Sequence, residues 1–258
     1  MGNVPTIMWR ELKSFFFGPI AYIVFFVFYL TYALWFAFLV GQYGLAGAGD
    51  PTMGRRPVGI EFPFSHVFDL WFVLVMVVMA PVLTMRLFAE ERRSGTMEML
   101  MTAPVTDVEV AVGKYLAALA VYLLMLAPTV VYVFVLQWLA ASPLDLGPIL
   151  GTYLGLVLMG MLFLAMGAFA SSLTSNQIIA AVLGVGLTST MLAFVFLRYS
   201  YEPGDAGYQT ISYFSVLLHL QSDFGRGVVD TRRLIFYLSG TAFFLFFTVR
   251  MVEARKWR

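Results

Sequence analysis

Residues 86–114 read RLFAEERRSGTMEMLMTAPVTDVEVAVGK and form a charged segment in an otherwise apolar sequence. The charged segment contains nine charged side chains: Arg86, Glu90, Glu91, Arg92, Arg93, Glu98, Asp107, Glu109 and Lys114. On both sides of it the sequence is apolar over lengths that could cross a bilayer. A membrane protein that concentrates charge at one such junction is expected to present it to a soluble partner.

The composition of the whole chain predicts a polytopic helical membrane protein. Of its 258 residues, 60% are hydrophobic and 12% are charged, whereas soluble domains average about 25% charged residues. The apolar runs do not alternate with polar residues at every second position, as the strands of a membrane β-barrel do. The formal net charge of +1 argues against a nucleic-acid partner, and the absence of cysteine excludes disulfides and thiol-ligated metals.

Six apolar segments reach the roughly 20 residues that a membrane-spanning helix requires. They cover residues 16–41, 67–88, 107–140, 148–171, 177–198 and 231–251 and are expected to form one domain over residues 1–258. The third segment is longer than a bilayer requires. We therefore expect its start, from Asp107 to Lys114, to stand in water, and Pro128 to kink it.

Two shorter helices are expected outside the spans, which makes the predicted fold all-α. Residues 3–15 can place Ile7, Trp9 and Leu12 on one face, a pattern typical of an amphipathic helix at the membrane interface. The alternative is that these residues form only an irregular beginning of the first span and no separate helix. Residues 209–226 are too short to span and are expected to lie at the outer interface.

Basic residues predict the orientation, because cytoplasmic loops carry an excess of Lys and Arg. With six spans both termini share one side. That side holds ten basic residues: Arg10, Lys13, Arg86, Arg92, Arg93, Lys114, Arg250, Arg255, Lys256 and Arg258. The other side holds six: Arg55, Arg56, Arg198, Arg226, Arg232 and Arg233. Both termini are therefore expected in the cytoplasm.

Signals for the end of one helix and the start of another follow closely within the charged segment. Ser94-Gly95 is expected to end the helix that continues from the second span, because glycine weakens a helix interior by about 1 kcal/mol. Thr96 can cap a short new helix. In that helix three apolar residues share one stripe, Met97, Leu100 and Met101.

The same segment also encodes the start of the third span. Pro104 ends the short helix, and Thr106 with Glu109 has the spacing of a capping box. The alternative is an ordinary cytoplasmic loop whose charges only enforce topology.

The run EERRSGTMEMLMTAPV (residues 90–105), followed by Gly113-Lys114, resembles the permeases of type-2 ABC transporters. The likeness is strongest to the subgroup that includes gliding-motility and copper-site-assembly permeases, which FGRGVVD (residues 224–230) also matches. In that family a coupling helix between the second and third spans docks in a groove of a cytosolic ATPase. The resemblance assigns this role to Glu90, Glu91, Arg92, Gly95, Thr96, Glu98, Leu100 and Pro104.

The resemblance implies a transport subunit of the plasma membrane, the inner membrane in bacteria, rather than an enzyme. The only Gly-Lys pair, Gly113-Lys114, is followed by Tyr115 and lacks the upstream glycine of a phosphate-binding loop. ATP and Mg²⁺ are therefore expected on separate cytosolic ATPase subunits, and no cofactor on this chain. Six spans are half of a full transporter, so a second permease, identical or related, is also expected within the lipid.

An exporter is the expected activity, and two alternatives remain open. In the first, the chain passes ATPase motion to an extracytoplasmic accessory protein and no solute crosses the membrane. In the second, the chain is an integral-membrane enzyme, for which the sequence offers no convergent catalytic side chains.

Three further patterns can be compared with a structure. The two histidines, His66 and His219, are expected at loop surfaces on the outer side, without a metal site. Residues 171–177 are expected to form the second cytoplasmic turn. The glycines Gly151, Gly155, Gly160 and Gly167 form a GxxxG pattern and its extension, which indicates either a helix-packing face or the general frequency of glycine in spans.

Overall fold

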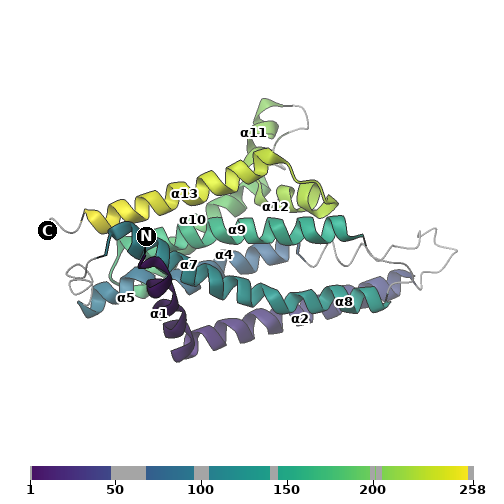
Figure 1. Cartoon of the computed structure of the whole chain (residues 1–258). Coiled ribbons are helices and arrows are strands. Elements are labelled where there is room, and N and C mark those ends of the chain that lie inside the picture. Colours follow the sequence, from purple (N-terminus) through teal and green to yellow (C-terminus); the bar gives the residue numbers. More distant parts are fainter. Residues whose placement is uncertain are drawn as a thin grey trace.

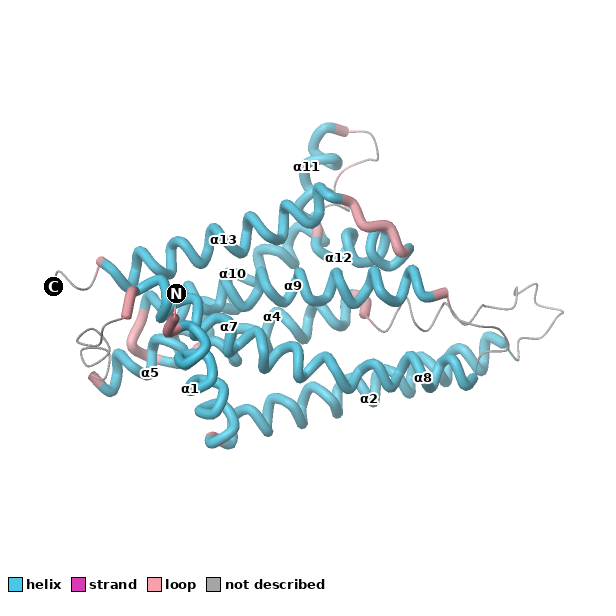
Figure 2. Tube along the Cα trace, in the orientation of Figure 1, coloured by secondary structure: helices cyan, strands magenta, loops and turns pink. Residues whose placement is uncertain are grey.

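A computed structural model describes residues 2–47, 68–95, 105–139, 145–197, 201 and 205–254. All regular elements in these ranges are helices, which confirms the predicted all-α class. The long helices run side by side along one direction, while α1 crosses them at the end where both termini lie (Figure 1; Figure 2).

Six stretches in the described part are long and apolar enough to cross a membrane: Pro19–Gln42, Leu70–Ser94, Asp107–Trp138, Leu146–Leu173, Gln177–Leu197 and Thr231–Glu253. They agree in number and place with the six predicted spans. The helices that form them are α2 (Pro19–Gly47), α4 (Leu70–Thr84) with α5 (Arg86–Ser94), α7 (Asp107–Leu126) with α8 (Val130–Leu139), α9 (Leu146–Leu173), α10 (Gln177–Leu197) and α13 (Thr231–Glu253).

Two of the spans are interrupted. Pro128 lies in the 3-10 turn η2 (Ala127–Thr129), which separates α7 from α8 as the sequence predicts. A second break, at Met85, was not expected. Pro81 lies within α4 and cannot donate a backbone hydrogen bond, and the Met85 amide closes the helix by donating to the Pro81 carbonyl at 2.8 Å. The C-terminal end of the second span is thus a separate helix, α5.

The N-terminal residues form their own helix, α1 (Val4–Phe17), and not a ragged start of the first span. Gly18 has an extended backbone and turns the chain from α1 into α2. The predicted apolar face is only partly correct, because Ile7 is buried whereas Trp9 is 55% exposed. The buried side of α1 packs on α7, where a Cβ at Gly113 would lie 2.9 Å from Ile7 Cγ2.

The helix α9 lies at the centre of the bundle and packs against α13, α10 and α4. Its glycines allow close contacts with α7, η5 and α4, which confirms the packing face. A Cβ at Gly160 would lie 2.1 Å from Cε1 of Tyr122, and one at Gly151 would lie 2.3 Å from the Phe224 carbonyl oxygen. Gly155 and Gly167 are equally crowded, against Phe224 and Thr84.

The expected outer helix is a series of short elements: α11 (Ala206–Phe214), α12 (Val216–Leu218), the π-helix η4 (His219–Asp223) and the 3-10 turn η5 (Phe224–Arg226). His219 is fully buried, so its expected surface position is wrong. Its Nδ1 lies 3.2 Å from the Tyr237 hydroxyl on α13, and its Nε2 lies 3.0 Å from the Tyr213 carbonyl. The short helices fold over the histidine and bury it. His66 lies outside the described residues.

Candidate functional site

The predicted coupling residues begin on α5, which ends as the sequence indicates. Gly95 adopts a left-handed backbone, with φ +71°, a conformation that glycine enters without steric cost. Ser94 donates from Oγ to the Glu90 carbonyl at 2.9 Å in the last turn. The other coupling residues proposed from the sequence, Thr96, Glu98, Leu100 and Pro104, lie outside the described residues.

The helix α7 begins with the predicted capping box. The Glu109 amide donates to Thr106 Oγ1 at 3.3 Å, and the Thr106 amide donates to Glu109 Oε2 at 3.0 Å. These bonds satisfy amides that have no partner inside the helix. The described chain therefore ends before residue 96 in a glycine helix end and resumes after residue 104 with a capped helix start.

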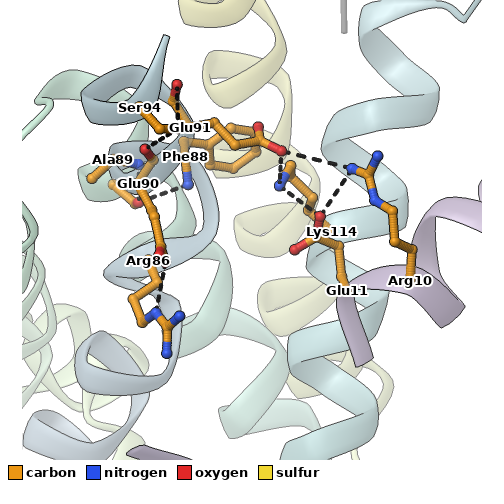
Figure 3. Close-up of polar contacts among 10 residues, drawn as sticks. Arg10, Glu11, Arg86, Phe88, Ala89, Glu90, Glu91, Ser94 and Lys114 are labelled. Carbon is orange, nitrogen blue, oxygen red and sulfur yellow. Dashed lines mark hydrogen bonds and ion pairs between the residues drawn. The ribbon is translucent and has the colours of Figure 1, made fainter. Parts of the chain in front are cut away.

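The two adjacent glutamates of α5 face in different directions. Glu90 is half exposed and accepts from Arg86 Nε at 2.7 Å, one turn away. The Glu91 side chain is 15% exposed and points toward α7 (Figure 3). Leu87 and Phe88 bury the apolar face of α5. The third charged residue in this prediction, Arg92, is half-buried.

Glu91 takes part in an ion cluster that joins three helices around a buried lysine. Lys114 of α7 lies at its centre, with Nζ 2.8 Å from Glu91 Oε1 and 3.0 Å from Oε1 of Glu11 on α1 (Figure 3). Arg10 adds a second, exposed cation, 3.1 Å from Glu11 and 3.7 Å from Glu91. The Phe88 ring closes one side, 5.8 Å from Lys114 Nζ. We call these four charged residues the ion cluster.

The burial of Lys114 corrects the expectation that Asp107 to Lys114 stand in water. The lysine side chain is 1% exposed because α1 lies across the start of α7 and covers it. The ion cluster contains two cations and two carboxylates, so its formal charge is zero. Burial without these partners would be very costly for a charged amine. Glu11 and Arg10 are on α1, whose contribution the sequence did not indicate.

A serine on α9 anchors α5 from the opposite side. Ser171 Oγ accepts from the amides of Phe88 and Ala89, at 3.1 and 3.3 Å, and donates to the Met85 carbonyl at 2.9 Å. These backbone groups lie at the break between α4 and α5, where intrahelical partners are lacking. Ser171 therefore belongs to α9, and the predicted turn over residues 171–177 is shorter, beginning at Thr174.

The arrangement is suited to holding helices together. Within the described residues no group of three or more His, Asp and Glu side chains is placed to hold a metal ion. The ion cluster and Ser171 together tie α5 to α1, α7 and α9.

Comparison with known proteins gives one finding on the family. A family model described as ABC-2 family transporter protein matches residues 64–224. The match includes the charged segment, Lys114 and Ser171, but not α1 or α13. No curated protein matches the chain.

Proposed function

The chain belongs to the ABC-2 family of transporter proteins, and on that premise we propose that it is the permease of an ATP-driven exporter, energised by a cytosolic ATPase that docks on residues 90–104. The working transporter pairs this chain with a second permease, identical or related, and with two ATPase subunits that bind ATP and Mg²⁺. Both termini and the charged segment face the cytoplasm. Membership of the gliding-motility and copper-site-assembly subgroup stays a prediction.

The ion cluster is the observation that carries this proposal. Residues 96–104 begin directly after α5, whose Glu91 is paired with Lys114 of α7. The same lysine is paired with Glu11 of α1. Separating buried opposite charges costs several kcal/mol. A displacement of the docked segment therefore moves α5, α7 and α1 together. Without the ion cluster the same displacement could bend α5 alone.

The break at Met85 supplies a place where this motion can be absorbed. At this break α5 is joined to α4 through a single intervening residue. Ser171 holds the start of α5 on α9. The far end of α5 can then tilt about this fixed point, while the ion cluster transmits the tilt to α7.

Co-purification and transport assays test the proposal on the full-length chain expressed with its ATPase. We expect Glu98→Lys and Leu100→Ala to reduce the amount of ATPase that co-purifies. The double variant Lys114→Met/Glu11→Gln keeps one cation and one carboxylate in the cluster. It should retain the ATPase but lose transport per ATP hydrolysed.

The matched control is Glu253→Gln at the same end of the bundle, an exposed carboxylate whose ion pair is with Arg250. It should leave both measurements unchanged. If the Glu98 and Leu100 variants kept full ATPase assembly and full transport, docking on residues 90–104 would be wrong.

Transmission of motion to an extracytoplasmic partner is the second candidate. The observation that favours it is the outer platform of α11, α12, η4 and η5, which packs on α9 and α10. ATPase activity measured with and without an outer-side protein separates the two functions. Stimulation that depends on such a protein, with no solute exported, would replace the exporter with this second function.

A further inference from the structure

A groove lies on the surface beside the turn that joins α1 to α2. Its volume is about 400 Å³, and it is lined by Trp9, Leu12, Lys13, Phe16, Phe17 and Tyr22. Three of the rings are strongly exposed, with Phe17 88%, Tyr22 59% and Trp9 55% accessible. Aromatic side chains with one apolar and one wet side are typical of membrane–water interfaces.

The groove has one cation, and its charge is not balanced within the described residues. The Lys13 ammonium lies over the Trp9 ring, 5.5 Å from its centroid. Among the residues that the structure describes, no carboxylate lies within ion-pair distance of it, whereas Arg10 and Lys114 are both paired. An anion at Lys13 would therefore meet a free positive charge at the edge of an apolar surface.

We propose that this groove binds one anionic phospholipid, with the lipid phosphate at Lys13 and an acyl chain along Phe16, Phe17 and Tyr22. The position supports a lipid, because α1 runs crosswise to the spans and meets α2 where the first span begins (Figure 1). A free phosphate would not need the aromatic lining, and a zwitterionic lipid would gain less from an unpaired amine. The volume is within the range of about 300–1,000 Å³ typical of ligand sites.

Lipid retention on the purified full-length protein tests this site without the ATPase, so its failure is separate from a failure of the proposed function. The measurement is native mass spectrometry with phosphatidylglycerol and phosphatidylcholine of identical acyl chains. We expect phosphatidylglycerol to be preferred. Lys13→Gln should lower that preference about fivefold, the factor expected for one lysine at an anionic surface. Lys13→Arg should retain it, and Trp9→Ala should reduce the retention of both lipids.

The matched control is Arg250→Gln. Arg250 also lies over an aromatic ring, 5.1 Å from the centroid of Phe246, but it is paired with Glu253 at 2.8 Å and lies outside the groove. This variant should leave the lipid preference unchanged. The proposal is overturned if Lys13→Gln keeps the preference, if Arg250→Gln lowers it equally, or if inorganic phosphate at millimolar concentration displaces the lipid.

Discussion

Lys114 and Glu91 form a buried ion pair, with Nζ and Oε1 2.8 Å apart, although residues 95–106 separate the helices that carry them. The pair closes a loop in the chain at the point where the predicted ATPase contact leaves the bundle. Its second anchor, Glu11, comes from α1, which lies outside the part of the chain that matches the family. The geometry thus adds the N-terminal helix to the proposed path between ATPase and membrane.

Replacing Lys114 by a neutral residue should destabilise the fold because the carboxylates of the ion cluster lose a cation, and not because packing is lost. Lys114→Met leaves two buried carboxylates with Arg10 alone, so we expect a loss of about 3–5 kcal/mol in the free energy of unfolding. Adding Glu11→Gln should restore part of this loss, because the charges then balance again. Unfolding in detergent measures both variants, with Lys13→Gln as an exposed control. Further destabilisation by Glu11→Gln would contradict the charge argument.

Ser171 and Ser172 offer a matched pair for the anchoring of α5. Both are fully buried on α9, but Ser172 bonds the Phe169 carbonyl of its own helix, whereas Ser171 bonds three backbone groups at the start of α5. Ser171→Ala should cost about 1–3 kcal/mol in unfolding free energy, because buried amides lose their acceptor. Ser172→Ala should cost less. Equal losses in the two variants would show that the contact to α5 contributes nothing.

Glycine packing on α9 can be tested against a glycine that faces open space. An alanine Cβ at Gly160 would lie 2.1 Å from the buried ring of Tyr122, whereas nothing lies within 4 Å of a Cβ at Gly186 on α10. Gly160→Ala should lower the unfolding free energy by about 1–3 kcal/mol through overpacking. Gly186→Ala should be neutral or stabilising by up to about 1 kcal/mol, because alanine favours helix. If the two variants unfolded alike, close packing at Gly160 would be excluded.

The features that could be predicted from the sequence are those with a local cause. Gly95, Pro128 and the Thr106–Glu109 capping box act within one helical turn, and each lies where the pattern places it. The spans are equally local, because each is a continuous apolar run. The role of residues 90–104 in binding an ATPase depends on a partner protein and stays a prediction.

The features that the sequence analysis missed depend on distant partners. Lys114 was expected in water because the third apolar segment is longer than a bilayer requires, but it bonds Glu11, 103 residues away. Ser171 was expected in a turn, but its Oγ accepts a hydrogen bond from the amide of Phe88, 83 residues away. No periodicity within a segment carries this information, since the contacts arise from the crossing of helices.

Stability at mildly acidic pH should depend on His219. Burial is the main cause that lowers the pKa of this histidine from its ordinary 6.5 to about 4, and the nearby Arg233 acts in the same direction, while Asp223 and the Tyr213 carbonyl oppose the shift. The folded protein therefore keeps the imidazole neutral, bonded to Tyr237, whereas the unfolded chain binds a proton below about pH 6.5. The contribution of the neutral His219 to the free energy of unfolding is therefore complete above about pH 6.5 and is lost as the pH falls toward 4.

The measurement is the unfolding temperature of the wild type and of His219→Gln between pH 4 and 7.5. The variant should be less stable at neutral pH, because a buried ring and its bond to Tyr237 are lost. Its unfolding temperature should also fall less steeply toward pH 4. The other histidine, His66, is present in both proteins, so the difference between the two curves isolates His219. Parallel curves would show that protonation of His219 does not oppose folding.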